Sequence, residues 1–340
     1  MAPELFTMSI PEPSVATALV QQAEEAGWDG ISFVDSQNLV ADPFIAISLA
    51  AQQAERIQFM TGVTNPATRH PAALATLAAT AQEASGGRLT LGIGRGDTAL
   101  FHLGRPPMPV ADFFARIEEL HAYLNRESVD MNGFDSRLRW LDRAQQTRVP
   151  VDIAASGPKV IAFAARTVER ITFAIGADPD RMAWGTKLAR TAMAEAGRAE
   201  RDVTFGAYVT VACNPDVDAA RALVRGSVAA FAHFSAMPGS TGAGLNEQDR
   251  ALVAEVGRAY DSNQHLFNGA AHSQVLPEEF VDRFAVIGDV DTCVKRLQEL
   301  VGLGLERLVI TGPSFGAIRD DAQLHTRLMT TEVLPALRQS

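Results

Sequence analysis

Residues 56–97 read RIQFMTGVTNPATRHPAALATLAATAQEASGGRLTLGIGRGD and contain one complete strand–helix–strand unit. Two short apolar runs each end in a loop rich in Gly, Asn or Asp, and an Ala/Leu-periodic segment long enough for several helical turns separates them. In parallel α/β proteins the carboxyl ends of the strands carry the chemistry. The polar residues of these two loops are therefore candidates for a functional site.

The composition of the chain is that of an ordinary globular protein. The chain has 340 residues, of which 47% are hydrophobic and 21% charged, and its mean hydropathy is close to zero. No apolar run approaches the roughly 20 residues that a membrane helix needs, and no basic region followed by an apolar stretch opens the sequence. We therefore expect a cytoplasmic protein that does not associate with membranes.

Charge and cysteine content exclude further classes. The formal net charge of −10 argues against nucleic acid as a partner, because phosphate backbones require clustered Lys and Arg. It leaves room for an anionic small molecule, which local amides can hold. Cys213 and Cys293 are far apart and have no other ligand-like residues at metal spacing, so we expect packing residues rather than a zinc site or a disulfide framework.

Strand-like and helix-like segments alternate along most of the chain. Besides the two strands of the opening stretch, apolar runs predict strands at 4–10, 30–34, 149–155, 170–175, 203–212 and 307–311. Eight strands, each followed by a helix, are the number in a closed parallel barrel, and their nearly continuous apolar character indicates burial on both faces. We therefore predict an α/β fold, a TIM (β/α)8 barrel.

A doubly wound open sheet is the structural alternative, with Gly92, Gly94 and Gly96 as its dinucleotide fingerprint. The glycines are spaced two apart rather than as G-x-G-x-x-G, and no ribose-binding acid follows the next strand. The barrel is therefore the better interpretation.

We expect a single domain, 1–340, with two insertions. In the first, at about 126–148, the residues MNGF (131–134) indicate a turn between short extended pieces. Outside this insertion, the segment ALFHLGRPPMP (99–109), which follows Asp97, is typical of a loop. The second, at about 231–278, contains His233, His265 and His272. A loop of this length is usually functional or itself partly helical.

Several motifs together carry a family resemblance. GVTNPATRHP followed by SGGRLTLGIGRGD, then AASGPK, IGADPDRM and LPEEFVDRFAVIGDVDTCVKRLQEL, resemble the bacterial luciferase-like superfamily of flavin and deazaflavin oxidoreductases. The likeness is greatest to the methylenetetrahydromethanopterin reductase branch, which uses the deazaflavin coenzyme F420. The resemblance extends over most of the chain and also implies a homodimer.

The resemblance implies a place for the redox ring. In this family the third strand ends in a bulge whose non-proline cis peptide supports the ring, and the matching bond is Gly62–Val63, followed by Thr64 and Asn65. Without the family, an ordinary tight turn would explain the same residues. With it, Gly92, Gly94 and Gly96 are better explained as room for this flat ring to approach the backbone. We expect Arg69 and His70, which follow this bulge, to cap the next helix rather than to reach a phosphate.

Two carboxylates match acidic positions of the family. Asp97 matches an acid that in some deazaflavin enzymes donates a proton, and a carboxyl poorly solvated beside an apolar ring suits general acid work. The alternative is that Asp97 caps the following helix. Asp35 matches a second acidic position. Relatives often have His immediately after it, whereas this chain has Ser36, and this difference argues against a proton relay through Asp35.

A third loop has features of an anion site. Ser156, Gly157, Pro158 and Lys159 follow the strand that ends at Ala155, and a Gly-containing turn that opens a helix presents amides and the positive end of the helix dipole. We predict that this loop, with Gly176 and Ala177, holds the cofactor phosphate; plain helix capping is the alternative.

The predicted function is hydride transfer between coenzyme F420 and a small organic substrate, with residues 231–278 as a lid and His272 as a candidate substrate-binding residue. A surface or helix-end histidine is the alternative for His272. An FMN-dependent monooxygenase supplied with reduced flavin is the main alternative function. More distant alternatives are a non-redox isomerase or lyase on the same barrel and a non-catalytic flavin-binding protein.

Overall fold

The computed structural model describes residues 2–143 and 147–339. The chain divides into two compact units, which are described here one at a time. The first, the N-terminal unit, comprises residues 8–154 and 167–170. The second, the C-terminal unit, comprises residues 1–7, 155–166 and 171–340. The expectation of a single domain stays a prediction.

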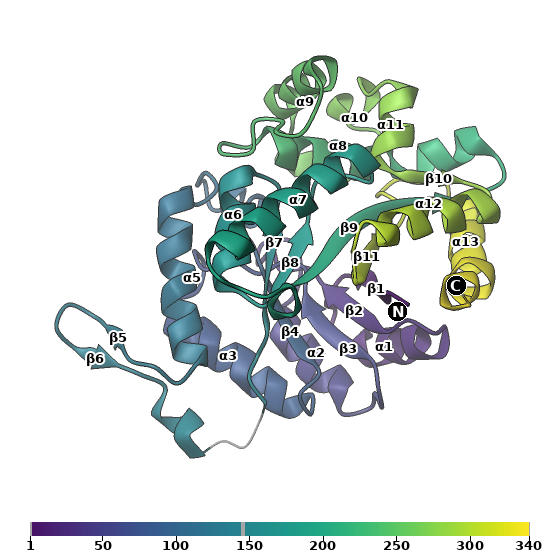
Figure 1. The fold of residues 1–340 in the computed structure, drawn as a ribbon. Coiled ribbons are helices and arrows are strands. Elements are labelled where there is room, and N and C mark those ends of the chain that lie inside the picture. Colours follow the sequence, from purple (N-terminus) through teal and green to yellow (C-terminus); the bar gives the residue numbers. More distant parts are fainter. Residues whose placement is uncertain (1, 144–146, 340) are drawn as a thin grey trace. The chain divides into compact units, whose positions relative to one another are not determined.

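The N-terminal unit contains parallel strands covered by helices (Figure 1). Its strands are β2 (Gly30–Phe33), β3 (Gln58–Thr61), β4 (Leu89–Ile93) and most of β7 (Val151–Ala155). Its helices are α1 (Ala16–Glu25), α2 (Pro43–Ala51), α3 (Pro71–Ala84), α4 (Thr98–Phe101) and α5 (Val110–Leu124). Prolines at the first positions of α2 and α3 begin these helices, since their fixed φ suits a first turn and their missing N–H costs nothing there.

The C-terminal unit has its own parallel strands. These are β1 (Glu4–Ser9, up to Thr7), β8 (Arg170–Phe173, from Ile171), β9 (Thr204–Cys213), β10 (Val286–Gly288) and β11 (Arg307–Thr311). The long strand β9 has two successive neighbours, because residues 206–210 pair with β11 and residues 211–213 pair with β10. The helices of this unit are α6 (Pro158–Thr167), α7 (Pro179–Glu195), α8 (Val217–Ala236), α9 (Glu247–Ala259), α10 (Ala271–Gln274), α11 (Glu278–Phe284), α12 (Val290–Gly302), α13 (Arg319–Leu328) and α14 (Leu334–Arg338).

The strand order is that of a closed parallel barrel. Within the described residues it runs β11-β1-β2-β3-β4-β7-β8-β9 and returns to β11, with β10 attached to β9. The predicted TIM-barrel class is confirmed. Strand β10, which is only three residues long and lies between a helix and Asp289, was not predicted from the sequence.

Local boundaries differ from the prediction in three places. The segment after Asp97 was expected to be a loop, but its first residues form α4, because Leu100 and Phe101 donate backbone hydrogen bonds to the Asp97 carbonyl. The sequence predicts a first helix at 13–26, but α1 begins at Ala16. The sequence predicts one final helix at about 320–338, but a π-helical turn, Met329–Val333, interrupts it before Pro335.

The first predicted insertion contains a short hairpin. Strands β5 (Val129–Asp130) and β6 (Asp135–Ser136) pair antiparallel, which confirms the turn at 131–134. Asn132 and Gly133 both have positive φ, the conformation that such a tight turn requires. Residues 144–146 of this insertion lie outside the described part of the chain.

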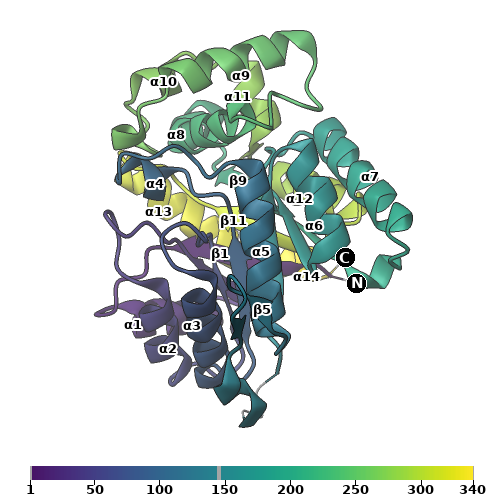
Figure 2. The ribbon, with the colours of Figure 1, turned by 90° about the vertical axis from the view of Figure 1, so that its left-hand side faces the viewer.

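The second predicted insertion is largely helical. It consists of the end of α8, then α9 and α10, up to the start of α11, and these helices gather at one end of the C-terminal unit (Figure 2). Apolar side chains such as Leu223, Val256 and Phe280 form a buried cluster between them. No helix within residues 2–143 and 147–339 is long and apolar enough to cross a membrane.

Candidate functional site

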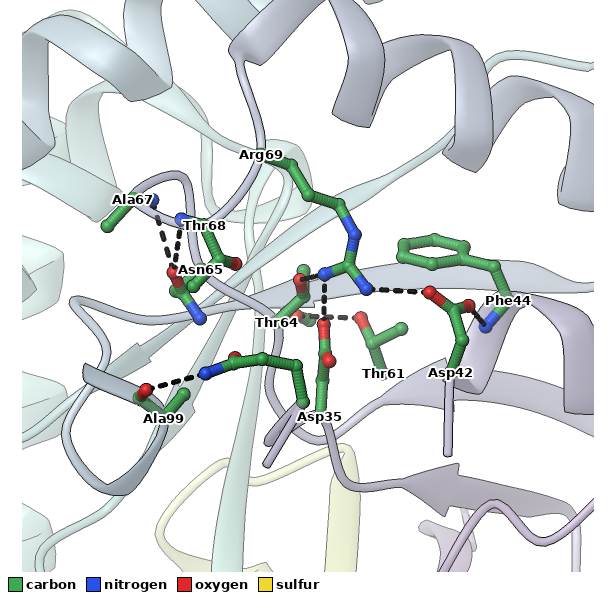
Figure 3. A network of polar contacts seen from close by, with 12 residues as sticks. Asp35, Asp42, Phe44, Thr61, Thr64, Asn65, Ala67, Thr68, Arg69 and Ala99 are labelled. Atoms are coloured by element: carbon green, nitrogen blue, oxygen red, sulfur yellow. Dashed lines mark hydrogen bonds and ion pairs between the residues drawn. The ribbon is translucent and has the colours of Figure 1, made fainter. Parts of the chain in front are cut away.

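A network of charged side chains joins the loops that follow β2 and β3 (Figure 3). Arg69 donates from Nη1 to Asp35 Oδ2 at 2.6 Å and from Nη2 to Asp42 Oδ2 at 2.7 Å. Nη1 also lies 3.3 Å from Thr64 Oγ1. Burial lowers the pKa of Arg69, but the charges and hydrogen bonds of the two carboxylates outweigh burial, and that pKa is raised overall.

Arg69 and His70 were both expected to cap α3, and only His70 does so. The expectation that Arg69 caps α3 is wrong, because its guanidinium is bound to Asp35 and Asp42. His70 does cap α3: its Nδ1 accepts the Ala72 N–H at 3.2 Å. The Asp35 side chain is only 3% exposed, and Arg69 occupies its carboxylate. A proton-donor role for Asp35 would therefore require Arg69 to release it.

The peptide bond between Gly62 and Val63 is cis, as the resemblance implied. The bulge is bonded to the strands on both sides, since Gly62 N donates to Phe33 O at 2.7 Å and Thr64 N donates to Gly92 O at 3.0 Å. Asn65 is buried, and its Oδ1 accepts the N–H groups of Ala67 and Thr68. The Asn65 side chain thus fixes the turn that leaves the bulge.

Glycines in β4 and just after it allow close approach of β3 and of this bulge. A Cβ on Gly92 would lie 2.0 Å from the Thr61 carbonyl oxygen of β3, and a Cβ on Gly94 would lie 2.9 Å from Val63 Cγ2. Gly96 has a φ of +73°, which favours glycine. The expectation that these glycines leave space for a ring is wrong for Gly92, because the neighbouring strand fills that space.

Asp97 is half-buried where β4 leads into α4. Its side chain makes no capping hydrogen bond to the described residues of α4. Burial lowers the pKa of the neighbouring Arg95, and the negative charge of Asp97 partly opposes that effect. The loop of Asp97 adjoins the bulge, because Gly94 N donates to Thr64 O at 2.9 Å and a Cβ on Gly96 would lie 3.3 Å from Asn65 Cγ.

In the C-terminal unit, the predicted phosphate loop does open a helix. β7 ends at Ala155 and α6 begins at Pro158, so Ser156 and Gly157 form the turn between them. Ser156 Oγ lies 2.8 Å from Ser240 Oγ and donates to the Phe234 carbonyl oxygen at 3.2 Å. The protein itself therefore engages the Ser156 hydroxyl.

The turn of Gly176 and Ala177 is also engaged by the protein. The Ala177 N–H donates to Phe284 O at 2.9 Å, and the Ala177 carbonyl accepts from Arg296. Beside this turn lies the guanidinium of Arg181, which is fully buried. Sequence reasoning missed Arg181, although it stands within the motif IGADPDRM, in the first turn of α7.

The three histidines of the second insertion gather around Tyr260, a residue that sequence reasoning also missed. The ring of His233 stacks on Tyr260 at 4.0 Å between centroids, and His272 lies at 4.3 Å. His265 Nδ1 is 2.6 Å from the Tyr260 hydroxyl. His272 is 1% exposed, so the interpretation of it as a surface histidine is wrong, and burial lowers its pKa.

The similarity of this chain to known proteins extends over nearly its whole length. A family model described as luciferase-like monooxygenase matches residues 3–307. The 5,10-methylenetetrahydromethanopterin reductase of Methanolobus tindarius is 27% identical over 296 residues, which cover 86% of this chain and 88% of that protein. The F420-dependent glucose-6-phosphate dehydrogenase of Microbacterium testaceum is 28% identical, with 93% and 91% covered.

A solved structure shows the same fold. The coenzyme F420-dependent tetrahydromethanopterin reductase from Methanopyrus kandleri superposes with a TM-score of 0.75 at 22% identity, over 99% of this chain and all of that one. The match of the family model to residues 3–307 carries the assignment: this chain belongs to the luciferase-like monooxygenase family.

Proposed function

We propose that this protein is an oxidoreductase that transfers a hydride between coenzyme F420 and a small organic substrate. The observation that carries the proposal is the contact between two loops of the N-terminal unit. The backbone of residues 62–65, the predicted ring support, is hydrogen-bonded to the loop that bears Asp97. The relatives favour F420 over FMN, because a glucose-6-phosphate dehydrogenase and a tetrahydromethanopterin reductase among them are described as F420-dependent.

Each group of residues has a separate task in this proposal. The bound deazaflavin would supply hydride chemistry at its ring carbon. The bulge of Gly62 and Val63 would orient the ring, and Asp97 would give a proton to, or take one from, the reacting substrate. Asp35 would act through Arg69 by holding Thr64 in place. The turn of Ser156 and Gly157, with Lys159, would bind the cofactor phosphate. A homodimeric state and a cytoplasmic location stay predictions.

One titration separates the candidate functions. The purified protein is titrated with coenzyme F420 and with FMN in separate experiments, and quenching of fluorescence is followed. We expect F420 to bind more tightly. Tighter binding of FMN would favour the alternative of a monooxygenase, to which the family description also refers. A protein that binds neither cofactor would be the non-redox isomerase or lyase, and the proposal would fail.

Replacing Asp97 tests the chemical role. Asp97→Asn keeps the shape of the side chain but removes the acid, so we expect F420 affinity within about threefold of wild type and turnover reduced by about 100-fold or more. Turnover is measured with an organic substrate that wild-type protein reduces or oxidises. Asp112→Asn, an exposed acid on α5, is the matched control. Unchanged turnover by Asp97→Asn would show that Asp97 takes no part in the mechanism. It would favour the alternative of a non-catalytic flavin-binding protein.

A further inference from the structure

The segment MPGSTGAG, residues 237–244, lies against the turn of Ser156 and Gly157 within the C-terminal unit. It connects α8 to α9, and we call it the cover segment. A Cβ added to Gly157 would lie 2.4 Å from the Gly239 carbonyl oxygen and 2.9 Å from Ser240 Cα. The two backbones are thus in direct contact, and only glycine fits at position 157.

Two serine hydroxyls connect the cover segment to the turn. Ser156 Oγ donates to the Phe234 carbonyl, so the hydrogen of the 2.8 Å bond between Ser156 and Ser240 comes from Ser240. Ser240 is 3% exposed. Because a serine hydroxyl rotates freely about its C–O bond, Ser240 can redirect this hydrogen to an anion at the start of α6. A charge-assisted hydrogen bond would then replace a neutral one.

Arg181 holds both ends of the cover segment. Its Nη1 donates to Ser235 Oγ, just before the segment, at 2.7 Å, and its Nε donates to Ala243 O, near the end of it, at 3.2 Å. Nη1 also donates to Ile175 O, the residue before Gly176. The guanidinium therefore lies between the end of β8 and the cover segment.

The charge of Arg181 is only partly compensated. Among the described residues, its Nη2 is buried without a hydrogen-bond partner, and no carboxylate lies within 4.0 Å of the guanidinium. Burial lowers the pKa of Arg181 to about 10, so the group is still protonated at neutral pH. The negative charge of Asp178 opposes the effect of burial only in part, and an anion bound nearby would stabilise the buried cation further.

We propose that the cover segment completes the phosphate site of the cofactor, with the Ser240 hydroxyl as a ligand of the phosphate and Arg181 as the residue that positions the segment and supplies the counter-charge. This inference rests on the proposed function and names binding residues that the sequence does not reveal. When the phosphate binds, the Ser240 hydroxyl must give up its hydrogen bond to Ser156 and donate to the phosphate instead.

The test compares a cofactor with and without its phosphate. The pairs are FMN with riboflavin, which differ by the phosphate alone, and coenzyme F420 with the deazaflavin that ends at its ribityl chain and so lacks the phosphate and the tail attached to it; the pair that binds the wild type is used. Ser240→Ala should weaken binding of the phosphorylated member roughly tenfold and leave the phosphate-free member unchanged. Ser240→Thr, which keeps the hydroxyl, should restore most of the loss.

Thr241→Ala is the matched control, because it removes an exposed hydroxyl from the same segment. It should leave all affinities unchanged. If Ser240→Ala binds the phosphate-free member with wild-type affinity, the variant is folded. Equal loss for both members, or no loss for either, would overturn the assignment of Ser240 while leaving the proposed function intact. Wild-type protein that binds no member of either pair would overturn both.

Discussion

At the scale of single residues, Arg69 is the centre of the polar network after β2 and β3. Arg69→Ala would leave the Asp35 carboxylate buried without its cation. We expect the free energy of unfolding to fall by about 3 kcal/mol, because an unpaired buried charge costs far more than the pair contributes. Urea denaturation at pH 7 measures this change.

The control for Arg69 is another ion-paired arginine of the same unit. Arg116 pairs with Glu119 three residues away on α5, and its side chain is 40% exposed. Exposed pairs of this kind are worth roughly 0–0.5 kcal/mol, so Arg116→Ala should change the free energy of unfolding very little. Equal effects of the two substitutions would contradict the importance assigned to the Asp35–Arg69 pair.

His325 predicts how stability depends on pH. Its Nδ1 accepts the Cys213 N–H at 3.0 Å, and burial lowers its pKa from 6.5 to about 4. The folded protein therefore binds this proton less readily than the unfolded chain does. The contribution of His325 to stability is complete above pH 6.5 and is lost as the pH falls toward 4, by about 3 kcal/mol in total.

Urea denaturation at pH 7, 5.5 and 4.5 tests this dependence. His325→Asn cannot titrate in this range, so its free energy of unfolding should fall less steeply with decreasing pH than that of wild type. The variant is expected to be less stable at pH 7, because it leaves space in the core. Parallel pH profiles of the two proteins would show that another group causes the acid lability.

At the scale of elements, the pairing of β3 with β4 depends on Gly92. A Cβ at this position would meet the Thr61 carbonyl oxygen at 2.0 Å, and a backbone carbonyl cannot rotate away. We expect Gly92→Ala to lower the free energy of unfolding by about 3 kcal/mol or to prevent folding. Thermal and urea unfolding measure the effect.

Gly302 provides the comparison for Gly92. It lies in the last turn of α12, and an added Cβ would meet no heavy atom within 4 Å. Gly302→Ala should therefore raise the free energy of unfolding by about 0.5–1 kcal/mol through helix propensity. A Gly92→Ala variant as stable as Gly302→Ala would show that β3 and β4 separate easily.

The long periodic elements were predictable, and the short ones were not. Helix α3 shows its Ala/Leu period over 14 residues, and β11 is a strand of five buried residues with an apolar centre, Leu308 to Ile310. In contrast, α4 and β10 have four and three residues, too few for a period to appear. Their existence depends on contacts with neighbours, such as the pairing of β10 with the end of β9.

At the scale of the whole molecule, the barrel followed from the number and character of the strands. Strands buried on both faces must be apolar throughout, so their sequences reveal the architecture directly. The acidic net charge of −10 does not reveal the local cations. Arg69 and Arg181 are largely or fully buried, and neither belongs to a basic cluster in the sequence.

The sequence by itself determined the barrel, the family and the loops that carry the candidate site, because the strand pattern and the motif order depend only on the order of residues along the chain. It also located the bulge at Gly62–Val63, through the resemblance. Only the tertiary structure decided which side chains meet. Asp35 and Arg69 are 34 residues apart, and Ser156 and Ser240 are 84 apart. Such pairs form because the fold brings distant loops together, and no local periodicity or propensity encodes them.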